Sequence, residues 1–184
     1  MAKLILIVLK WKSKFKFQYQ NFLYVLSCAI IIVVLALFID PGILGSGKSV
    51  MESMLFTPDN HTYLTMPVMR IIGPVISFTT GSAGGIFAPS LSAGASVGSL
   101  FAGWFDLSAT TTNLLVLAVM VGFLTGVTRT PFTSAILVLE MTDRHSVIFH
   151  LMLAGMLASL VSLAIDRRSL YDYLKVSYIK ELQE

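Results

Sequence analysis

The chain has 184 residues, of which 55% are hydrophobic and only 12% are charged, and its mean hydropathy is +0.81. This composition is typical of an integral membrane protein and excludes an ordinary soluble globular domain. The net charge of +3 does not indicate nucleic acid as a partner, because the basic residues cluster at Lys10–Lys16 and Arg167–Lys175, beside apolar runs, as in juxtamembrane anchoring. Cys28 is the only cysteine, so we expect neither a disulfide framework nor a cysteine-based metal cluster.

Residues 1–21 predict a helix stub followed by a basic cytoplasmic loop. Residues 1–9 are apolar but too few to span a membrane, and the lysines that follow alternate with aromatic side chains. An excess of Lys and Arg is characteristic of cytoplasmic loops, so this segment is placed inside. An interfacial amphipathic helix is the alternative for this start.

Membrane helices are expected over residues 22–165. Phe22–Ile39 is uncharged and rich in Ile, Val and Leu. At about 1.5 Å per residue it just crosses a hydrocarbon core about 30 Å thick. Pro41 and Gly42 end this helix, and the turn lies outside because the preceding lysines lie inside.

Residues 42–49 match the phosphate-loop pattern G-x-x-x-x-G-K-[ST]. A phosphate loop follows a short buried strand in a soluble α/β domain, whereas a run of membrane-spanning length precedes this one. A nucleotide-binding membrane protein that uses Lys48 is therefore kept only as a distant alternative.

The next apolar segment contains a break. Residues 71–105 carry no Asp, Glu, Lys or Arg, yet Gly81, Gly84, Gly85 and Pro89 interrupt them. Lipid cannot satisfy backbone groups that leave a helix, so such a break must be buried in protein or line a wet cavity. We expect a helix over residues 66–79 and a new helix that begins near residues 87–89, where proline suits the first turn.

The start of this new helix is a candidate anion site. The amides of Gly85, Ile86, Phe87 and Ala88 have no intrahelical partner, and the helix macrodipole adds about half a positive charge there. These donors are dipoles rather than Lys or Arg, so they hold an anion weakly enough for it to leave, as conduction requires. A glycine and proline kink in a purely structural helix is the alternative.

The following helices are expected to pack closely. Residues 107–128 form a second uncharged run of spanning length, whereas residues 130–139 are too few to cross a membrane, which indicates a long helix followed by a short returning one. Small residues recur at four-residue spacing, which allows close helix contact. They are Ser90, Gly94, Gly98 and Ala102, and then Gly122 and Gly126.

The last full span is predicted over His145–Ile165. The arginines at 167 and 168 place its end and the C-terminus in the cytoplasm. His150 has no second histidine or carboxylate at helical spacing, so it is assigned to helix packing. Residues 166–184 are predicted to form a final helix on the cytoplasmic side. Its apolar side would carry Leu170, Tyr173, Leu174 and Ile179.

Several motifs of this chain resemble those of the CLC chloride channel and transporter family. Gly-Gly-Ile-Phe-Ala-Pro at Gly84–Pro89, with Ser-Phe-Thr-Thr-Gly-Ser before it, resembles the family's GxFxP segment. Leu137–Asp143 is similar to the acidic end of a family helix, and Gly45 and Gly47 match a glycine turn that opens a short helix. The resemblance implies an all-α membrane protein, the second inverted repeat of a CLC-type helical bundle with broken, partly re-entrant helices.

The resemblance also implies a function, which is chloride transport across a membrane. In the family the amides at the Ile86 and Phe87 positions coordinate the central chloride, and a final-helix tyrosine, here Tyr171, contacts it through a neutral hydroxyl. It implies no enzymatic activity, no metal and no cofactor, with chloride as the transported ligand. Glu140 is either a proton-path residue or, as we prefer, a structural residue at a helix end.

The expected partners are the lipid bilayer, chloride or a similar monovalent anion, a missing N-terminal repeat and a second subunit of a dimer. The expected location is a bacterial inner membrane, crossed several times. The match covers only the second half of the family's membrane domain, since the chain has neither a Gly-Ser-Gly-Ile-Pro nor a Gly-Arg-Glu-Gly-Pro segment. We therefore expect a single partial domain over residues 1–184 that lacks the gating segments. Channel and proton-coupled exchanger both stay open, as does an accessory or non-functional membrane fragment that binds no ion.

Overall fold

A computed structural model describes residues 1–13, 15, 17–57, 62–81 and 84–181, and within these ranges every regular element is a helix. The all-α fold class is thereby confirmed. In chain order the elements are α1 (Ala2–Lys12), α2 (Gln18–Phe38), the short 3-10 helix η1 (Pro41–Ile43), α3 (Lys48–Phe56), α4 (Thr65–Thr79), α5 (Phe87–Trp104), α6 (Ala109–Thr128), α7 (Pro131–Thr142), the 3-10 helix η2 (His145–Val147), α8 (Ile148–Ile165) and α9 (Leu170–Glu181).

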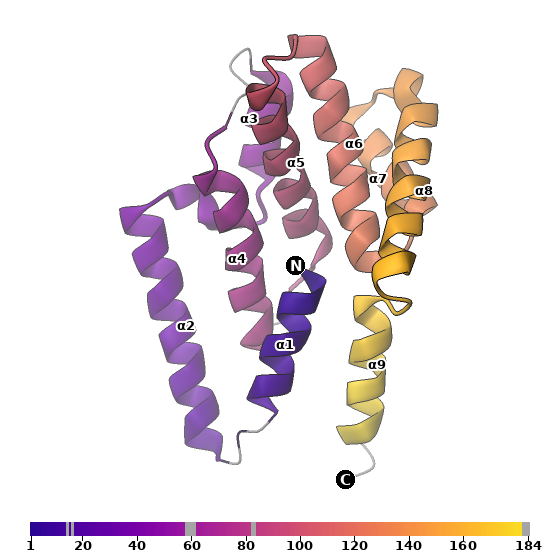
Figure 1. Ribbon diagram of the computed structural model, residues 1–184. Helices are drawn as coiled ribbons and strands as arrows, with labels where there is room; N and C mark the ends of the chain where they lie inside the picture. The colour runs from indigo at the N-terminus through magenta and orange to yellow at the C-terminus, as the bar shows by residue number, and fades with distance from the viewer. Residues whose placement is uncertain (14, 16, 58–61, 82–83, 182–184) are drawn as a thin grey trace.

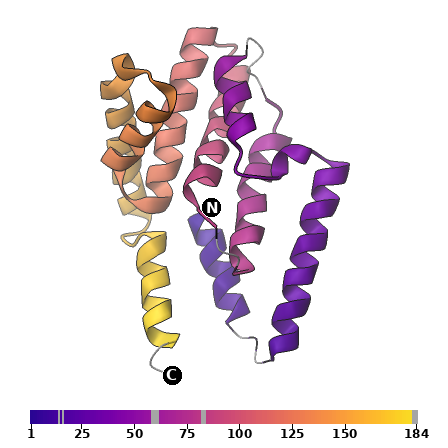
Figure 2. The same cartoon turned by 180° about the vertical axis from the view of Figure 1, so that it is seen from behind.

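The helices form one bundle in which α5 is central. Helix α2 stands at one edge of the molecule and α8 near the opposite edge, with α5 between them (Figures 1 and 2). The main core lies where α3, α5, α6, α7 and α8 meet. Its fully buried members include Leu91 and Ala95 of α5, Val116, Met120 and Leu124 of α6, Val138 of α7 and Leu151 of α8.

In the described part of the chain, three helical segments are long and apolar enough to cross a membrane: α2, α6 and residues 145–165. Helix α6 has 20 residues and α7, which follows it, has 12, so the predicted long helix followed by a short returning one is confirmed. Arg129 ends α6 in the left-handed conformation with φ 64°. Pro131 then occupies the first turn of α7, a position that favours proline.

Helices α5 and α6 approach each other at backbone distance. A Cβ added to Gly94 would lie 2.8 Å from the Cα of Met120 and 2.9 Å from the carbonyl oxygen of Val119. A Cβ added to Gly98 would lie 2.8 Å from the Cα of Val116. Backbone atoms cannot swing aside as side chains do, so these glycines permit the contact, and the predicted close-packing face of α5 is confirmed.

The second glycine pair makes a looser contact with α8. A Cβ on Gly122 would lie 3.7 Å from the Cβ of Ala158, and one on Gly126 would lie 3.6 Å from the Oγ of Ser162. These are ordinary van der Waals distances, so here small residues bring helices together without requiring glycine.

Two side chains lie differently from the sequence-based expectation. His150 is exposed on α8 and does not pack between helices, because it falls on the outward face of a helix at the edge of the bundle. Ile179 is 46% exposed, because the last turns of α9 extend away from the other helices (Figure 1). The α9 residues nearer its start pack as predicted, with Leu170 buried and Leu174 half-buried.

Candidate anion site

The break predicted within the uncharged run is present. Helix α4 ends at Thr79 and α5 begins at Phe87. The first turn of α5 lies about midway along the long axis of the molecule, well above the lower ends of α2 and α4 in the view of Figure 1. A helix therefore begins partway along the bundle rather than at one of its ends, as the glycines and proline of this segment indicate, and Gly84, Gly85 and Phe87 are exposed there.

The amides at the start of α5 are open. No side chain caps the helix, and its first backbone hydrogen bond runs from the Ser90 amide to the Ile86 carbonyl oxygen at 3.0 Å. No described residue accepts a hydrogen bond from the four backbone amides of residues 85–88. These N–H groups carry the positive end of the α5 macrodipole, so the segment offers donors and positive potential without a charged side chain.

A small hollow lies beside the first two of these amides, those of Gly85 and Ile86. Its volume is about 120 Å³, and it is lined by Pro74, Ser77 and Phe78 of α4 and by Gly84, Gly85, Ile86 and Pro89. A Cβ on Gly84 or Gly85 would meet no atom within 4 Å, so the glycine backbone faces open space. A water molecule occupies about 30 Å³ in the liquid, so the hollow has room for a small anion with part of its hydration shell.

Two side chains from the N-terminal part of the chain hold the end of α4 that leads into this loop. The Lys12 ammonium donates to the carbonyl oxygens of Thr79 and Thr80, both at 3.0 Å, and the hydroxyl groups of Tyr24 and Thr79 lie 2.8 Å apart. A lysine at a helix C-terminus satisfies orphan carbonyls and complements the dipole. Sequence reasoning assigned Lys12 to membrane anchoring, and no local pattern identifies its partner.

The start of α9 lies close to the start of α5. Leu170 and Ile86 belong to one buried cluster, together with Ile5, Val75 and Val127. The chain therefore brings together two segments that sequence analysis assigned to one site from distant positions. Figure 1 shows α5 and α9 beginning at similar levels of the molecule.

Tyr171 is the first residue after Leu170 in this helix. Its side chain is 43% exposed, and among the described residues its hydroxyl has no hydrogen-bond partner, so no hydrogen bond joins it to Ile86 or Phe87. Partial burial raises the pKa of the Tyr171 hydroxyl above its ordinary value, so the phenol is neutral at physiological pH and can donate. The roles of Gly85, Ile86, Phe87, Ala88 and Tyr171 as ion ligands stay predictions.

A reciprocal cap fixes the start of α9. The Asp172 carboxylate accepts hydrogen bonds from the Ser169 amide at 2.9 Å and the Ser169 hydroxyl at 2.8 Å, while the Asp172 amide donates to the Ser169 Oγ at 3.1 Å. This capping box orients the first turn and therefore Tyr171. The two hydrogen bonds that Ser169 donates hold the pKa of Asp172 below its ordinary value, and the bond from the amide has the larger effect.

We expect Ser169→Ala to destabilise the protein by about 1 kcal/mol at neutral pH, because it removes the N-cap oxygen. The folded-state pKa of Asp172 is depressed, so its contribution is present above its unfolded pKa and is lost as pH falls through the folded value. Thermal unfolding in detergent should show a deficit at pH 7 that shrinks near pH 2, with Ser146→Ala as an exposed control. An equal deficit at both pH values would contradict the contribution of the Asp172 carboxylate to the cap.

The loop that resembles a phosphate loop is filled by protein. Arg70 of α4 is 1% exposed, and its guanidinium donates to the carbonyl oxygens of Gly45 at 3.3 Å and Leu44 at 3.4 Å. Gly47 has φ 87°, and a Cβ there would clash with the side chain of Ser92. Backbone conformation and packing against α5 thus account for this glycine.

The surroundings of this loop also differ from those of a nucleotide site. The segment before it consists of α2 and η1 instead of a strand, which removes the structural context that a phosphate loop needs. The Lys48 ammonium is exposed and lies 3.7 Å from the Glu52 carboxylate, one turn along α3. The structure therefore favours a packing role for this motif.

Glu140 is exposed near the end of α7, a position that agrees with the preferred structural role more than with a buried proton path. The exposed Asp143 carboxylate just beyond it lies 3.2 Å from the His145 imidazole. Within the described ranges, no three His, Cys, Asp or Glu side chains come together in a way that would hold a metal ion.

These features define a multi-pass helical membrane protein with an interrupted helix whose open amides lie partway along the bundle. A family model described as voltage gated chloride channel matches residues 1–163. The chain therefore belongs to the voltage-gated chloride channel family, as the motifs at Gly84–Pro89 and Leu137–Asp143 indicate.

Curated relatives agree with this assignment. The voltage-gated ClC-type chloride channel ClcB of Salmonella typhimurium is 31% identical over 147 residues, which cover 77% of this chain and 35% of the relative. The ClcB proteins of Shigella boydii and of Escherichia coli strain SMS-3-5 are 30% and 29% identical over the same length. The chain thus spans about a third of the length of the curated relatives that it matches.

Proposed function

We propose that this chain forms the anion-holding part of a chloride transport protein of a bacterial cell membrane. The observation that carries the proposal is the start of α5, where the amides from Gly85 to Ala88 are uncapped and an open hollow lies beside Gly85 and Ile86. The curated relatives are named as chloride channels, and chloride is a ligand of the size and charge that such a hollow suits. Transport, not catalysis, is the proposed activity.

The chemistry of these donors favours transport over retention. Amide dipoles attract an anion, yet they lack the full charge that would trap it, and conduction requires a site from which the ion can leave. A neutral hydroxyl at Tyr171 adds one donor of the same kind. We infer that Ile86, Phe87 and Tyr171 contact the transported anion and that Gly85 and Ala88 complete the group of donors.

We further propose that the chain acts as one half of a larger assembly. It spans only 35% of its ClcB relative, and a pore built from two repeats needs both. The complete assembly then consists of this chain together with the segments that its relatives carry beyond the matched region. A second such unit in a dimer is part of the proposal, as is a cytoplasmic C-terminus, which the arginines at 167 and 168 favour.

Chloride efflux from proteoliposomes tests the function. We expect the complete assembly to release chloride selectively and the isolated chain to release none. Tyr171→Phe removes one hydrogen bond to a charged ligand, worth about 1.5 kcal/mol or more, so half-maximal flux should need roughly tenfold more chloride. Tyr63→Phe is the matched control, because Tyr63 is 87% exposed and lies before α4, far along the chain from both predicted segments.

Two outcomes would contradict parts of this proposal. Robust selective flux through the isolated chain would show that no second half is needed. A complete assembly that neither binds bromide nor releases chloride would favour the accessory membrane subunit, which needs only the packing faces.

A further inference from the structure

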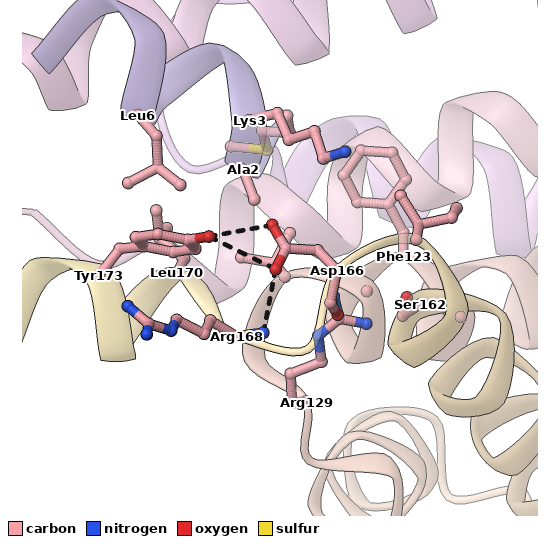
Figure 3. Close-up of a pocket in the computed structure, with 15 residues that line it drawn as sticks. Ala2, Lys3, Leu6, Phe123, Arg129, Ser162, Asp166, Arg168, Leu170 and Tyr173 are labelled. Carbon is pink, nitrogen blue, oxygen red and sulfur yellow. Dashed lines mark hydrogen bonds between the residues drawn. The ribbon is translucent and has the colours of Figure 1, made fainter. Parts of the chain in front are cut away.

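A second and larger cavity lies beside the candidate anion site. Its volume is about 390 Å³, and residues of α1, α6, α8 and α9 line it (Figure 3). Phe123, Val127 and Leu170 belong both to this lining and to the apolar cluster that contains Ile86. The lining of the cavity is therefore continuous with the apolar cluster at the start of α5.

The charged side chains that line this cavity are mainly cationic. Lys3, Arg129 and Arg168 contribute three positive charges, and Asp166 contributes one negative charge. Of the described carboxylates, none lies within 4.0 Å of a side-chain nitrogen of these three cations, so none neutralises them in an ion pair. Net positive potential in a partly enclosed space favours an anionic occupant.

Arg129 carries the least satisfied of these charges. Its Nη2 donates to the backbone oxygen of Asp166 at 2.8 Å, but its Nε and Nη1 are buried and have no partner among the described residues. A buried donor without an acceptor costs free energy comparable to a lost hydrogen bond. Two such donors on one guanidinium point to an acceptor that the described residues do not supply.

Asp166 is held on the wall of the same cavity. Its carboxylate accepts hydrogen bonds from the Arg168 amide at 3.1 Å and from the Tyr173 hydroxyl at 3.3 and 3.4 Å (Figure 3). The Arg168 amide first, and the Tyr173 hydroxyl and nearby cations after it, keep the pKa of Asp166 below its ordinary value. Asp166 is therefore anionic at neutral pH and weakens the attraction of the cavity for an anion without cancelling it.

We propose that this cavity is a second anion site, in which Arg129 is the main ligand and Lys3 and Asp166 set the strength of binding. The occupant is a small hydrated monovalent anion of the kind that the α5 amides hold, so this inference rests on the proposed function. The site acts as an antechamber that raises the local anion concentration beside the α5 amides. The opposing charge of Asp166 keeps occupancy brief, which transport requires.

The test uses two neutralising substitutions with opposite expected signs in the complete assembly. Arg129 has φ 64°, a conformation that asparagine tolerates well, so Arg129→Asn removes the charge with little backbone strain. It should raise the chloride concentration for half-maximal flux about tenfold at low ionic strength, whereas Asp166→Asn should lower it several-fold. Both shifts should diminish when a large impermeant salt is added, because salt screens the charges.

Outcomes separate this inference from the proposed function. If wild-type flux and the Tyr171→Phe effect are present but Arg129→Asn changes nothing, the antechamber is wrong and the α5 site stands. If Arg129→Asn and Asp166→Asn both raise the chloride concentration for half-maximal flux, the roles of these residues are structural and the inference fails. A third outcome concerns inorganic phosphate. If phosphate competes with chloride only when Arg129 is present, and neither substitution shifts the chloride concentration for half-maximal flux, the cavity binds phosphate groups and the inference is overturned.

Discussion

Gly85→Leu is expected to abolish anion transport in the complete assembly while leaving the fold intact. A Cβ at Gly85 meets no atom within 4 Å, and the backbone there is not in a left-handed conformation, so the protein accommodates a side chain. The leucine side chain would then occupy the hollow of about 120 Å³ that lies beside Gly85 and Ile86. A hydrogen bond to a charged group contributes at least about 1.5 kcal/mol. An anion that loses two such bonds therefore binds roughly a hundredfold more weakly.

Gly85→Ala supplies the graded control for this prediction. It adds a single methyl group to the same hollow, so a smaller loss of flux is expected, with the same melting temperature as the wild type and as Gly85→Leu. The measurement pairs chloride efflux with thermal unfolding in detergent. Wild-type flux through Gly85→Leu would show that the hollow is not on the anion path.

Gly94→Leu is expected to disrupt the protein rather than its site. A Cβ at this position would lie 2.8 Å from the Cα of Met120 and 2.9 Å from the carbonyl oxygen of Val119, so α5 and α6 must separate. Overpacking a core typically costs about 1–3 kcal/mol and sometimes more, and here backbone atoms block relief. We expect a loss of about 3 kcal/mol or more, seen as a large drop in melting temperature or as failure to purify a folded protein.

Gly122→Ala is the matched control for that loss. Its Cβ would lie 3.7 Å from the Cβ of Ala158, an ordinary contact, and alanine has a better helix propensity than glycine by up to about 1 kcal/mol. This variant should be as stable as the wild type or slightly more so. Equal damage from Gly94→Leu and Gly122→Ala would mean that backbone contact between α5 and α6 is not what requires glycine.

The interrupted helix was predictable from local sequence because its signals are local. Glycines and a proline within an uncharged run predict a break, and the structure ends α4 at Thr79 and begins α5 at Phe87. The small-residue spacing from Ser90 to Ala102 likewise predicts close packing, since a four-residue period places those side chains on one helix face. The ends of the helices were predicted to within a few residues for the same reason.

Features that depend on which helices meet were not predictable. The contact of Lys12 with the end of α4, the cavity around Arg129 and the bond from Tyr173 to Asp166 join residues far apart in sequence or across a turn. Sequence reasoning treated Lys12 as part of an anchoring run and placed Tyr173 only on the apolar side of the final helix. His150 was misplaced because a histidine within an apolar helix does not reveal which face of α8 turns outward.

Anomalous diffraction from crystals of the complete assembly soaked in bromide tests the central claim most directly. A bromide peak within hydrogen-bonding distance of the Ile86 and Phe87 amides is the expected result, with Tyr171 on its open side. Bromide bound elsewhere in the assembly, with those amides occupied by protein acceptors, would contradict the assignment of the start of α5 as the site that holds the transported ion.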